Sequence, residues 1–294
     1  MTRPIVRRFL QVLVNRGPWG FCVTVFQKIA RSLHLIKSPT PVSPSSTPSD
    51  SNGNISSGSA SLIHPFDLAY GTDTSGLIWG ENLPSGHRND LWSTAYYGIS
   101  PSLFTQLLSS LNLDWQRFTF LDLGSGKGRA LLLASRFPFK RIVGVELSPE
   151  LSADATVNIQ RFAAPWQQCR NLEAHHGDAT AFNYPSGPIV LYLYNPFLSP
   201  VLKRCLKNLT RSLAKEPREI HLVYVNPAFE RLLNKHAPTL EKQWSQTFTM
   251  TEEDALADRF GSTQEEVAVY RYLPPEPSSS NTTASDFATS RDIP

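Results

Sequence analysis

Five short apolar runs alternate with amphipathic stretches through the middle of the chain. The apolar runs cover residues 118–123, 141–147, 171–176, 189–194 and 220–225. The stretches with helical periodicity between and after them cover 129–136, 149–162, 200–214 and 227–236. This alternation predicts right-handed βαβ units and a mainly parallel sheet. Because the runs are almost continuously apolar, we expect most of these strands to be buried on both faces.

Further elements are predicted on either side of this region. A Ser100-Pro101 pair begins a helix that extends to about Leu111, and two more strand-like runs lie at 243–250 and 266–272. Proline is well tolerated in the first turn of a helix. The pattern therefore predicts an α/β fold: a doubly wound, mostly parallel sheet of seven strands, preceded by an N-terminal helical and irregular extension.

Composition divides the chain into segments. Residues 38–60 are almost entirely Ser, Pro, Thr, Gly and Asn, and residues 274–294 have a similar composition. Such stretches cannot bury enough apolar area to offset the entropy of ordering, so we predict a disordered linker and a disordered tail. The folded domain is predicted to span 61–273, with a cap or lid at 61–112 and a core at 113–273.

Residues 1–37 form a basic arm with seven Lys and Arg and no acidic residue. Removing these seven charges from the formal net charge of +3 leaves −4 for the remainder, which argues against a protein that coats nucleic acid. Residues 5–36 also contain many apolar side chains. Two interpretations remain open: amphipathic helices on an anionic membrane surface, or a helical hairpin packed on the folded domain.

Two further observations limit the class of protein. Three widely spaced cysteines without a CxxC pattern indicate neither a zinc site nor a disulfide framework, so no metal is predicted. A cytoplasmic location fits best, with peripheral membrane contact through the arm as an option. The apolar runs near the N-terminus are too short to span a membrane. No pattern typical of an RNA-binding module appears, so a nucleic-acid partner is not predicted.

A glycine-rich turn is the most informative motif. Gly124, Gly126 and Gly128 alternate directly after a predicted strand and before a predicted helix. Glycine lets a ligand approach the backbone where a Cβ would intrude, so we expect a small ligand over this turn. The alternative is a tight strand-to-helix connection without a ligand. We expect Lys127, within the turn, to be solvated.

Acidic residues end three consecutive predicted strands. Asp122 precedes the glycine turn, Glu146 ends the second strand and Asp178 ends the third. In open parallel sheets, ligands bind at this edge. A carboxylate at Glu146 can accept hydrogen bonds from two ribose hydroxyls, and one at Asp178 can accept a hydrogen bond from an exocyclic amine. Each acid alone is more simply a surface or capping residue, but the three together indicate a site.

The ordered set DLGSGKGR, VGVE, GDA and LYNPF resembles the motifs of class I S-adenosylmethionine (SAM)-dependent methyltransferases. The resemblance covers 118–225, or 118–272 with the last two strands, and implies a Rossmann-like sheet whose last strand is antiparallel between the fifth and sixth. By this resemblance SAM is the cofactor, and the three glycines, with Ser125 between them, leave room for its methionine part. The resemblance further implies that Asp122 orients the ammonium, that Glu146 binds the ribose, and that Asp178 with the backbone of Ala179 recognises the adenine.

Two other classes of function remain alternatives. A dinucleotide oxidoreductase has GxGxxG spacing and a helix N-terminus facing a pyrophosphate. Here the third glycine comes one residue earlier, and Asp122 would repel a pyrophosphate but attract an ammonium. The other alternative is a non-catalytic module that binds SAM or a partner on the same fold.

The predicted methyl acceptor site begins at Asn195-Pro196-Phe197, after the fourth strand. This tripeptide resembles the Asn-Pro-Pro-aromatic motif of amino-group methyltransferases, which implies that Asn195 and a backbone carbonyl hold the target nitrogen while Phe197 packs against it. The sequence has one proline where that motif has two, and a simple turn with Phe197 in the core is the alternative. Asn226-Pro227 has the same turn chemistry, and a structural turn is favoured there. The predicted acceptor is an amino nitrogen of a protein or small molecule.

The segment at 66–101 is rich in aromatic residues and is predicted to form a cap or a lid over the SAM site. Tyr97 begins a short stretch similar to one in Rossmann-type protein-lysine methyltransferases, and it is a second catalytic candidate. The other candidates for an acceptor pocket are Tyr96, Trp79, Trp92 and His87, with Asp73 or His87 as proton acceptors. The alternative is a cap whose aromatic side chains simply fill the core.

Overall fold

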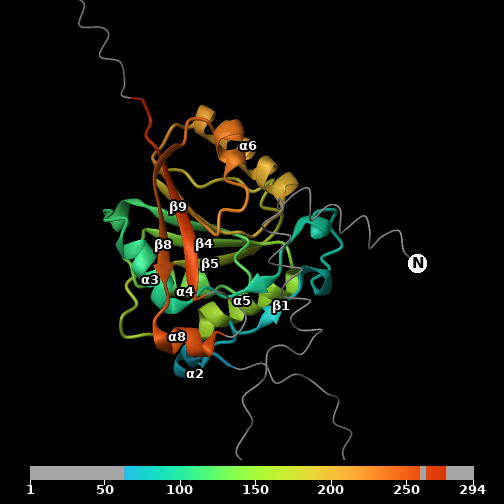
Figure 1. Cartoon of the computed structure of the whole chain (residues 1–294), viewed down its shortest axis with the longest axis vertical. Helices are drawn as coiled ribbons and strands as arrows, with labels where there is room; N and C mark the ends of the chain where they lie inside the picture. The colour runs from blue at the N-terminus through green and yellow to red at the C-terminus, as the bar shows by residue number, and fades with distance from the viewer. Residues whose placement is uncertain (1–62, 259–262, 276–294) are drawn as a thin grey trace, which may run out of the picture.

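The computed structural model describes residues 63–258 and 263–275 (Figure 1). The basic arm at 1–37, the linker at 38–60 and residues 276–294 of the predicted tail lie outside the described residues, so these segment assignments remain predictions. No helix in the described part of the chain is both long enough and apolar enough to cross a membrane.

The predicted seven-stranded α/β fold is confirmed. The strands of the large sheet are β3 (Thr119–Leu123), β4 (Arg141–Glu146), β5 (Leu172–His176), β6 (Ile189–Tyr194), β7 (Ile220–Val225), β8 (Glu241–Thr249) and β9 (Gln264–Tyr272). The α-helices are α2 (Pro65–Tyr70), α3 (Pro101–Ser109), α4 (Arg129–Ala134), α5 (Pro149–Arg161), α6 (Ser199–Lys215), α7 (Arg231–His236) and α8 (Glu252–Ala257). A separate pair, β1 (Leu77–Ile78) and β2 (Tyr96–Tyr97), is antiparallel, and the 3-10 helices are Gly80–Asn82, Asp90–Trp92 and Trp115–Arg117.

The strand order across the large sheet is β5-β4-β3-β6-β7-β9-β8. The first five of these pair in parallel, and β9 is antiparallel to both β7 and β8. Strand β9, the last of the seven along the chain, thus lies between β7 and β8, which are the fifth and sixth. The order reverses between β3 and β6, and in sheets of this type such a switch point opens a crevice at the carboxyl ends of the strands.

Helices cover both faces of the sheet, as expected for strands that are buried throughout. On one face, α3 and α4 pack with the inward residues of β3, β6, β7 and β9, while α6 and α7 fill the other face (Figure 1). All five residues of β3 and all six of β7 are buried. The edge strand β5 is mostly half-buried, as its two histidines and one glutamate require. The continuous apolar pattern therefore marks the central strands correctly.

Three local predictions differ from the structure. The predicted helix at 227–236 begins only at Arg231, because Asn226 has φ +52° and residues 226–230 form turns. Helix α2 lies in the predicted helical and irregular extension, where no individual helix before Ser100 was predicted, and α8 occupies a region for which the pattern predicted no element.

Contacts distant in sequence tie the ends of the domain together. The carboxylate of Asp254 in α8 accepts hydrogen bonds from Ser100 Oγ at 2.6 Å and from Ser102 N at 2.7 Å. Its second oxygen lies 3.7 Å from Nε2 of His64, which caps α2. The start of the cap, the start of α3 and the connection between β8 and β9 therefore meet at one buried carboxylate.

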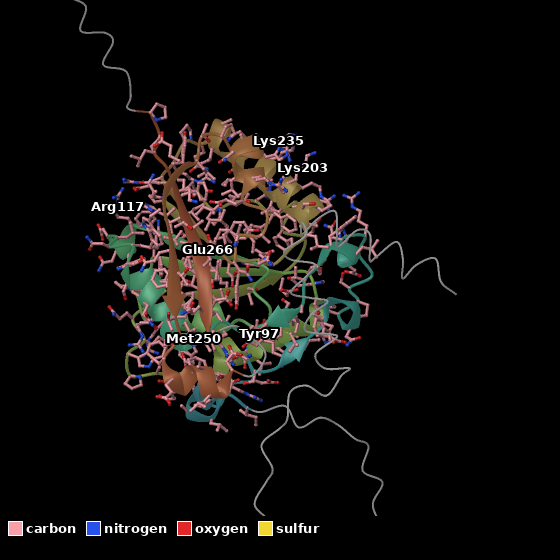
Figure 2. All side chains as sticks on the ribbon, in the orientation of Figure 1. Tyr97, Arg117, Lys203, Lys235, Met250 and Glu266 are labelled. Atoms are coloured by element: carbon pink, nitrogen blue, oxygen red, sulfur yellow. The ribbon has the colours of Figure 1, made fainter. Side chains whose placement is uncertain are left out.

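The outer surface of α6 and α7 is basic. Figure 2 shows Lys203 of α6 and Lys235 of α7 on the same outer side of the molecule. Partial burial lowers the pKa of His236, and the charges of Lys203, Lys207 and Lys235 add to this shift. His236 is therefore mostly neutral at pH 7, and the positive charge of this surface comes from Lys and Arg.

Candidate functional site

A cavity opens at the carboxyl edge of the sheet beside the switch point between β3 and β6. Its lining combines the glycine turn, the ends of β4 and β6 and the segment 93–99 of the cap. Of the predicted site residues, it includes Asp122, Gly124, Ser125, Gly126, Glu146, Asp178, Ala179, Pro196, Phe197 and Tyr97. Gly128 and Asn195 lie next to this lining in the chain. The fold thus brings the predicted cofactor and acceptor residues to one place.

The glycine turn is packed closely by side chains of the protein itself. Gly124 and Gly126 have φ of +89° and +53°, which few residues other than glycine adopt readily. A Cβ on Gly126 would lie 2.3 Å from ring atoms of Tyr96, and a Cβ on Gly124 would lie 2.4 Å from Cβ of Pro196. The cap and the loop after β6 therefore both rest on this turn. Room for the methionine part of SAM at these glycines remains a prediction.

Lys127 is not solvated, contrary to the expectation from sequence. Its side chain is 10% exposed, with Nζ 2.9 Å from Oδ1 of Asp73 and 3.9 Å from a carboxylate oxygen of Asp154 in α5. The aliphatic part of a lysine is readily buried when its ammonium has carboxylate partners. Asp73, considered as a proton acceptor, instead pairs with this lysine and does not line the cavity.

Two carboxylates, that of the buried Asp122 and that of the half-buried Glu146, dominate the electrostatics of the cavity. Burial raises the pKa of Asp122 well above its usual range, and the nearby charge of Glu146 adds to this shift. Burial also raises the pKa of Glu146, although backbone amides of Ser148 and Gly126 oppose it by donating hydrogen bonds of 2.8 Å. A cation in this cavity would stabilise both carboxylates in their ionised forms.

Asp178 is held by several partners at the end of β5. Its Oδ1 accepts hydrogen bonds from Nδ2 of Asn89 at 3.0 Å and from N of Thr180 at 2.9 Å, and its Oδ2 accepts one from Oγ1 of Thr180 at 2.6 Å. Nε2 of His87 lies 4.0 Å from the same carboxylate. Because Asn89 and His87 belong to the cap, the cap is attached to the predicted adenine end of the cavity.

The loop after β6 has an unusual backbone and an unsatisfied side chain. Asn195 has φ +39°, and its Oδ1 is buried without a hydrogen-bond partner among the described residues. Its carbonyl accepts a hydrogen bond from Oγ1 of Thr94 at 3.0 Å, and the Pro196 carbonyl accepts one from N of Thr94 at 3.4 Å. Buried polar atoms in proteins are nearly always hydrogen-bonded, so this amide oxygen is free to accept a hydrogen bond from a bound group.

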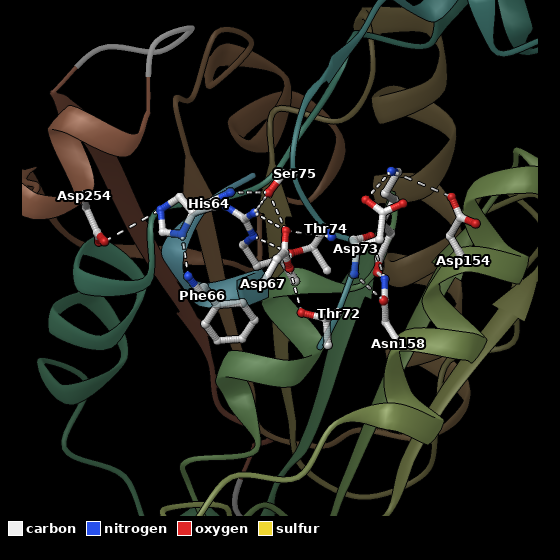
Figure 3. A network of polar contacts seen from close by, with 12 residues as sticks. His64, Phe66, Asp67, Thr72, Asp73, Thr74, Ser75, Asp154, Asn158 and Asp254 are labelled. Carbon is white, nitrogen blue, oxygen red and sulfur yellow. Dashed lines mark hydrogen bonds and ion pairs between the residues drawn. The ribbon is translucent and has the colours of Figure 1, made fainter. Parts of the chain in front are cut away.

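A buried ion pair joins the cap to the helix that follows the glycine turn (Figure 3). The Asp67 carboxylate lies 3.3 Å from Nη2 of Arg129, with side-chain exposures of 0% and 5%. Thr72, Thr74 and Ser75 donate to the same carboxylate. Burial acts to raise the pKa of Asp67, but these hydrogen bonds and Arg129 outweigh it and lower the pKa below its usual value. The hydroxyl of Tyr96 also donates to the Thr74 carbonyl at 2.6 Å.

Only some of the aromatic side chains predicted to shape the acceptor pocket line the cavity. Tyr96 and Tyr97 line the cavity, and the hydroxyl of Tyr97 is buried without a hydrogen-bond partner in the described structure. Trp79 is 49% exposed, and Trp92 packs against the core on the α6 side. Trp79, Trp92 and His87 lie outside the cavity lining. The cap thus fills part of the core and also covers the site.

Residues 120–216 match the family model described as "Methyltransferase domain". That match spans the glycine turn, all three acids and the loop after β6, on a sheet with the order described above. This part of the chain is therefore similar to a methyltransferase domain. A search of curated proteins found no match.

Solved methyltransferase structures are among those similar to this chain. One is a SAM-dependent methyltransferase from Methanosarcina mazei, with 12% identity, a TM-score of 0.41, and coverage of 57% of this chain and 97% of that one. A glycopeptide N-methyltransferase complexed with SAM has 12% identity, a TM-score of 0.41, and coverage of 61% and 96%. A geranyl diphosphate C-methyltransferase from Streptomyces coelicolor has 13% identity, a TM-score of 0.40, and coverage of 58% and 76%.

The carboxylates of the cavity suit a cationic ligand. Asp122 and Glu146 line the cavity with raised pKa values, and the ammonium and sulfonium of SAM, the predicted cofactor, would stabilise their ionised forms. The described residues include no group of three or more His, Cys, Asp or Glu that could hold a metal ion. The assignments of Asp122, Glu146 and Asp178 to particular parts of SAM remain predictions.

Proposed function

We propose that this methyltransferase transfers the methyl group of SAM to an amino nitrogen. The observation that carries the proposal is the buried, unpartnered Oδ1 of Asn195 at the carboxyl edge of β6. An amide oxygen can accept a hydrogen bond from an N–H and hold that nitrogen in one orientation. SAM supplies an electrophilic methyl carbon when bound.

The residues of the chain mainly align the acceptor and exclude water. Phe197 lines the cavity, and one of its ring atoms would lie 3.4 Å from a Cβ on Gly124, so the ring lies between the loop and the cofactor turn. Thr94 of the cap fixes the carbonyls of Asn195 and Pro196. Holding two reactants in line without intervening water lowers the entropic part of the barrier. The acceptor is thus proposed to enter between the cap and the loop after β6.

The experiment that tests this proposal begins with isothermal titration of the full chain with SAM, its demethylated product and NAD. We expect SAM to bind with a dissociation constant of about 1 μM, or about −8 kcal/mol, and NAD not to bind. The full chain is then incubated with SAM carrying a labelled methyl group and with n-butylamine, phenol or 2-mercaptoethanol. Label is expected in n-butylamine, and label only in the phenol or the thiol would refute the amino assignment.

Replacing Glu146 with alanine is expected to weaken SAM binding at least about 10-fold, because charged hydrogen bonds contribute about 1.5–3 kcal/mol each. The matched control is Glu173→Ala on the neighbouring strand β5, where the carboxylate pairs with Arg141 at 2.6 Å and both side chains are 37% exposed. Titration of the control should give the affinity of the unmodified chain. Equal SAM affinities for the two variants would show that Glu146 does not contribute to SAM binding.

A further inference from the structure

A tyrosine and a glutamate form a hydrogen-bonded pair beside Asn195. Tyr194 ends β6, and its hydroxyl donates to Oε1 of Glu265 at 2.9 Å. Glu265 is the second residue of β9, and Val267 of β9 pairs with Val225 at the end of β7. Since β9 is antiparallel to β7, Glu265 lies at the edge of the sheet where β6 and β7 end. The pair therefore belongs to the same edge as the proposed acceptor site.

Unpartnered hydroxyls lie close to this pair. Tyr192 and Tyr194 alternate on β6, so their side chains share the face of the sheet that α3 and α4 cover. The Tyr192 hydroxyl is buried and, like that of Tyr97, lacks a hydrogen-bond partner in the described part of the chain. All three tyrosines line the cavity. The lining of the cavity thus includes phenol hydroxyls, which can accept a hydrogen bond from an N–H donor.

Glu265 is a buried acid that has no ion-pair partner among the residues the structure describes. Its exposed fraction is 7%, and the ion pairs found within the described residues do not include it. Burial raises its pKa to about 7, the Asp258 charge adds to this and the Tyr194 hydrogen bond opposes it. The groups that act on it or share its surroundings are Tyr194 and Tyr192 of β6 and Asp258 after α8. A buried carboxylate is costly unless a cation or hydrogen-bond donors compensate it.

We infer that Glu265, acting through Tyr194, is a positioning residue that selects a cationic primary amine as the methyl acceptor and takes up its proton. This inference rests on the proposed function. The ammonium of the acceptor gives one proton to the Glu265 carboxylate, relayed by the Tyr194 hydroxyl. The freed nitrogen lone pair then forms the N–C bond as the C–S bond of the sulfonium breaks. The products are a methylated ammonium, a neutral thioether and a protonated Glu265, which returns its proton to solvent.

The chain offers a matched control for this pair. Glu230 accepts a hydrogen bond from the Tyr270 hydroxyl at 2.6 Å, in the same chemistry, but Lys242 lies 2.7 Å from the same oxygen, and Tyr270, unlike Tyr194, does not line the cavity. Glu265→Gln and Glu230→Gln remove the same charge and nearly preserve shape. Far-UV circular dichroism and thermal melts establish that both variants are folded, and Tyr194→Phe provides a second variant that removes only the relay hydroxyl.

The test compares binding of n-butylammonium and of neutral n-butanol to the full chain saturated with the demethylated cofactor, by ligand-observed NMR. We expect n-butylammonium to bind at least about 10-fold more tightly than n-butanol at pH 8, and expect this preference to fall at pH 5.5, where Glu265 is protonated. Glu265→Gln should lose the preference at both pH values, Tyr194→Phe should weaken it, and Glu230→Gln should retain it. Retention of the preference and its pH dependence by Glu265→Gln would overturn the inference.

Methyl transfer separates failure of this inference from failure of the proposed function. If the unmodified chain labels n-butylamine but Glu265→Gln does so at the same rate with the same pH profile, only the role of Glu265 is wrong. If the unmodified chain binds SAM but labels phenol or 2-mercaptoethanol instead of the amine, the proposed function is wrong. If it shows no preference for n-butylammonium over n-butanol, the cationic acceptor is excluded.

Discussion

Replacing Asp67 with alanine is expected to lower the free energy of unfolding by about 3–5 kcal/mol, because the change leaves the Arg129 guanidinium buried without a counter-charge. Arg129 is 5% exposed at the start of α4, and the hydroxyls of Thr72, Thr74 and Ser75 would also lose their acceptor. Burial of one charge without its partner is among the few single changes with an effect of this size.

Chemical unfolding of the full chain, followed by circular dichroism, measures this change. The matched control is Glu173→Ala, which breaks a shorter ion pair of 2.6 Å whose two side chains are each 37% exposed. An exposed pair contributes about 0–1 kcal/mol, so the control should unfold almost as the unmodified chain does. Equal losses for the two variants would mean that burial of the Asp67 pair has no energetic consequence.

Replacing Asn195 with alanine is expected to reduce the rate of methyl transfer to n-butylamine about 100-fold, or about 2.7 kcal/mol in the barrier, with SAM affinity unchanged. The side-chain amide is proposed to hold the acceptor, whereas the SAM site is formed by the glycine turn and the acids. A loss of this size is typical for removal of one group that orients the reacting atoms. Turnover with labelled SAM and titration with SAM measure the two effects.

Asn226→Ala is the control for this substitution. Asn226 follows β7 as Asn195 follows β6, it also precedes a proline, and it also has positive φ, of +52°. The two variants therefore place alanine in similarly strained backbone. Asn226 does not line the cavity, and its N donates to the Glu266 carbonyl at 2.7 Å as part of a turn. If Asn226→Ala lost as much turnover as Asn195→Ala, backbone strain and not the side chain would explain the loss.

Much of the fold could be predicted from sequence because its signals are local. The strands of the sheet are apolar runs bounded by turn residues, and Pro101 and Pro149 mark the first residues of α3 and α5. The position of the glycine turn and of Asp122 followed from the rule that parallel strands bind ligands at their carboxyl ends. The sequence also placed Asn195 directly after the fourth strand, and in the structure it follows β6.

The remaining features depend on contacts between distant residues, which carry no periodic signal. Asp67 and Arg129 are 62 positions apart, and Tyr194 and Glu265 are 71 positions apart. The prediction for Lys127 was wrong because its partner Asp73 lies in the cap, 54 positions earlier. One local hint existed for the cap: an acid followed by three hydroxyl residues within eight positions, at 67–75, can satisfy a buried carboxylate.

The three-way contact at Asp254 affects the order in which the domain can form. The Ser100 hydroxyl, at the N-cap of α3, and Asp254 are 154 positions apart, and the Ser102 amide is 152 positions from the same carboxylate. Contacts of such sequence separation close late, since the entropy of the intervening loop must first be lost. During synthesis the contact of the cap and the start of α3 with Asp254 therefore forms only after the β8–β9 hairpin has left the ribosome. Until then the polar groups of the cap and of the start of α3 stay solvated.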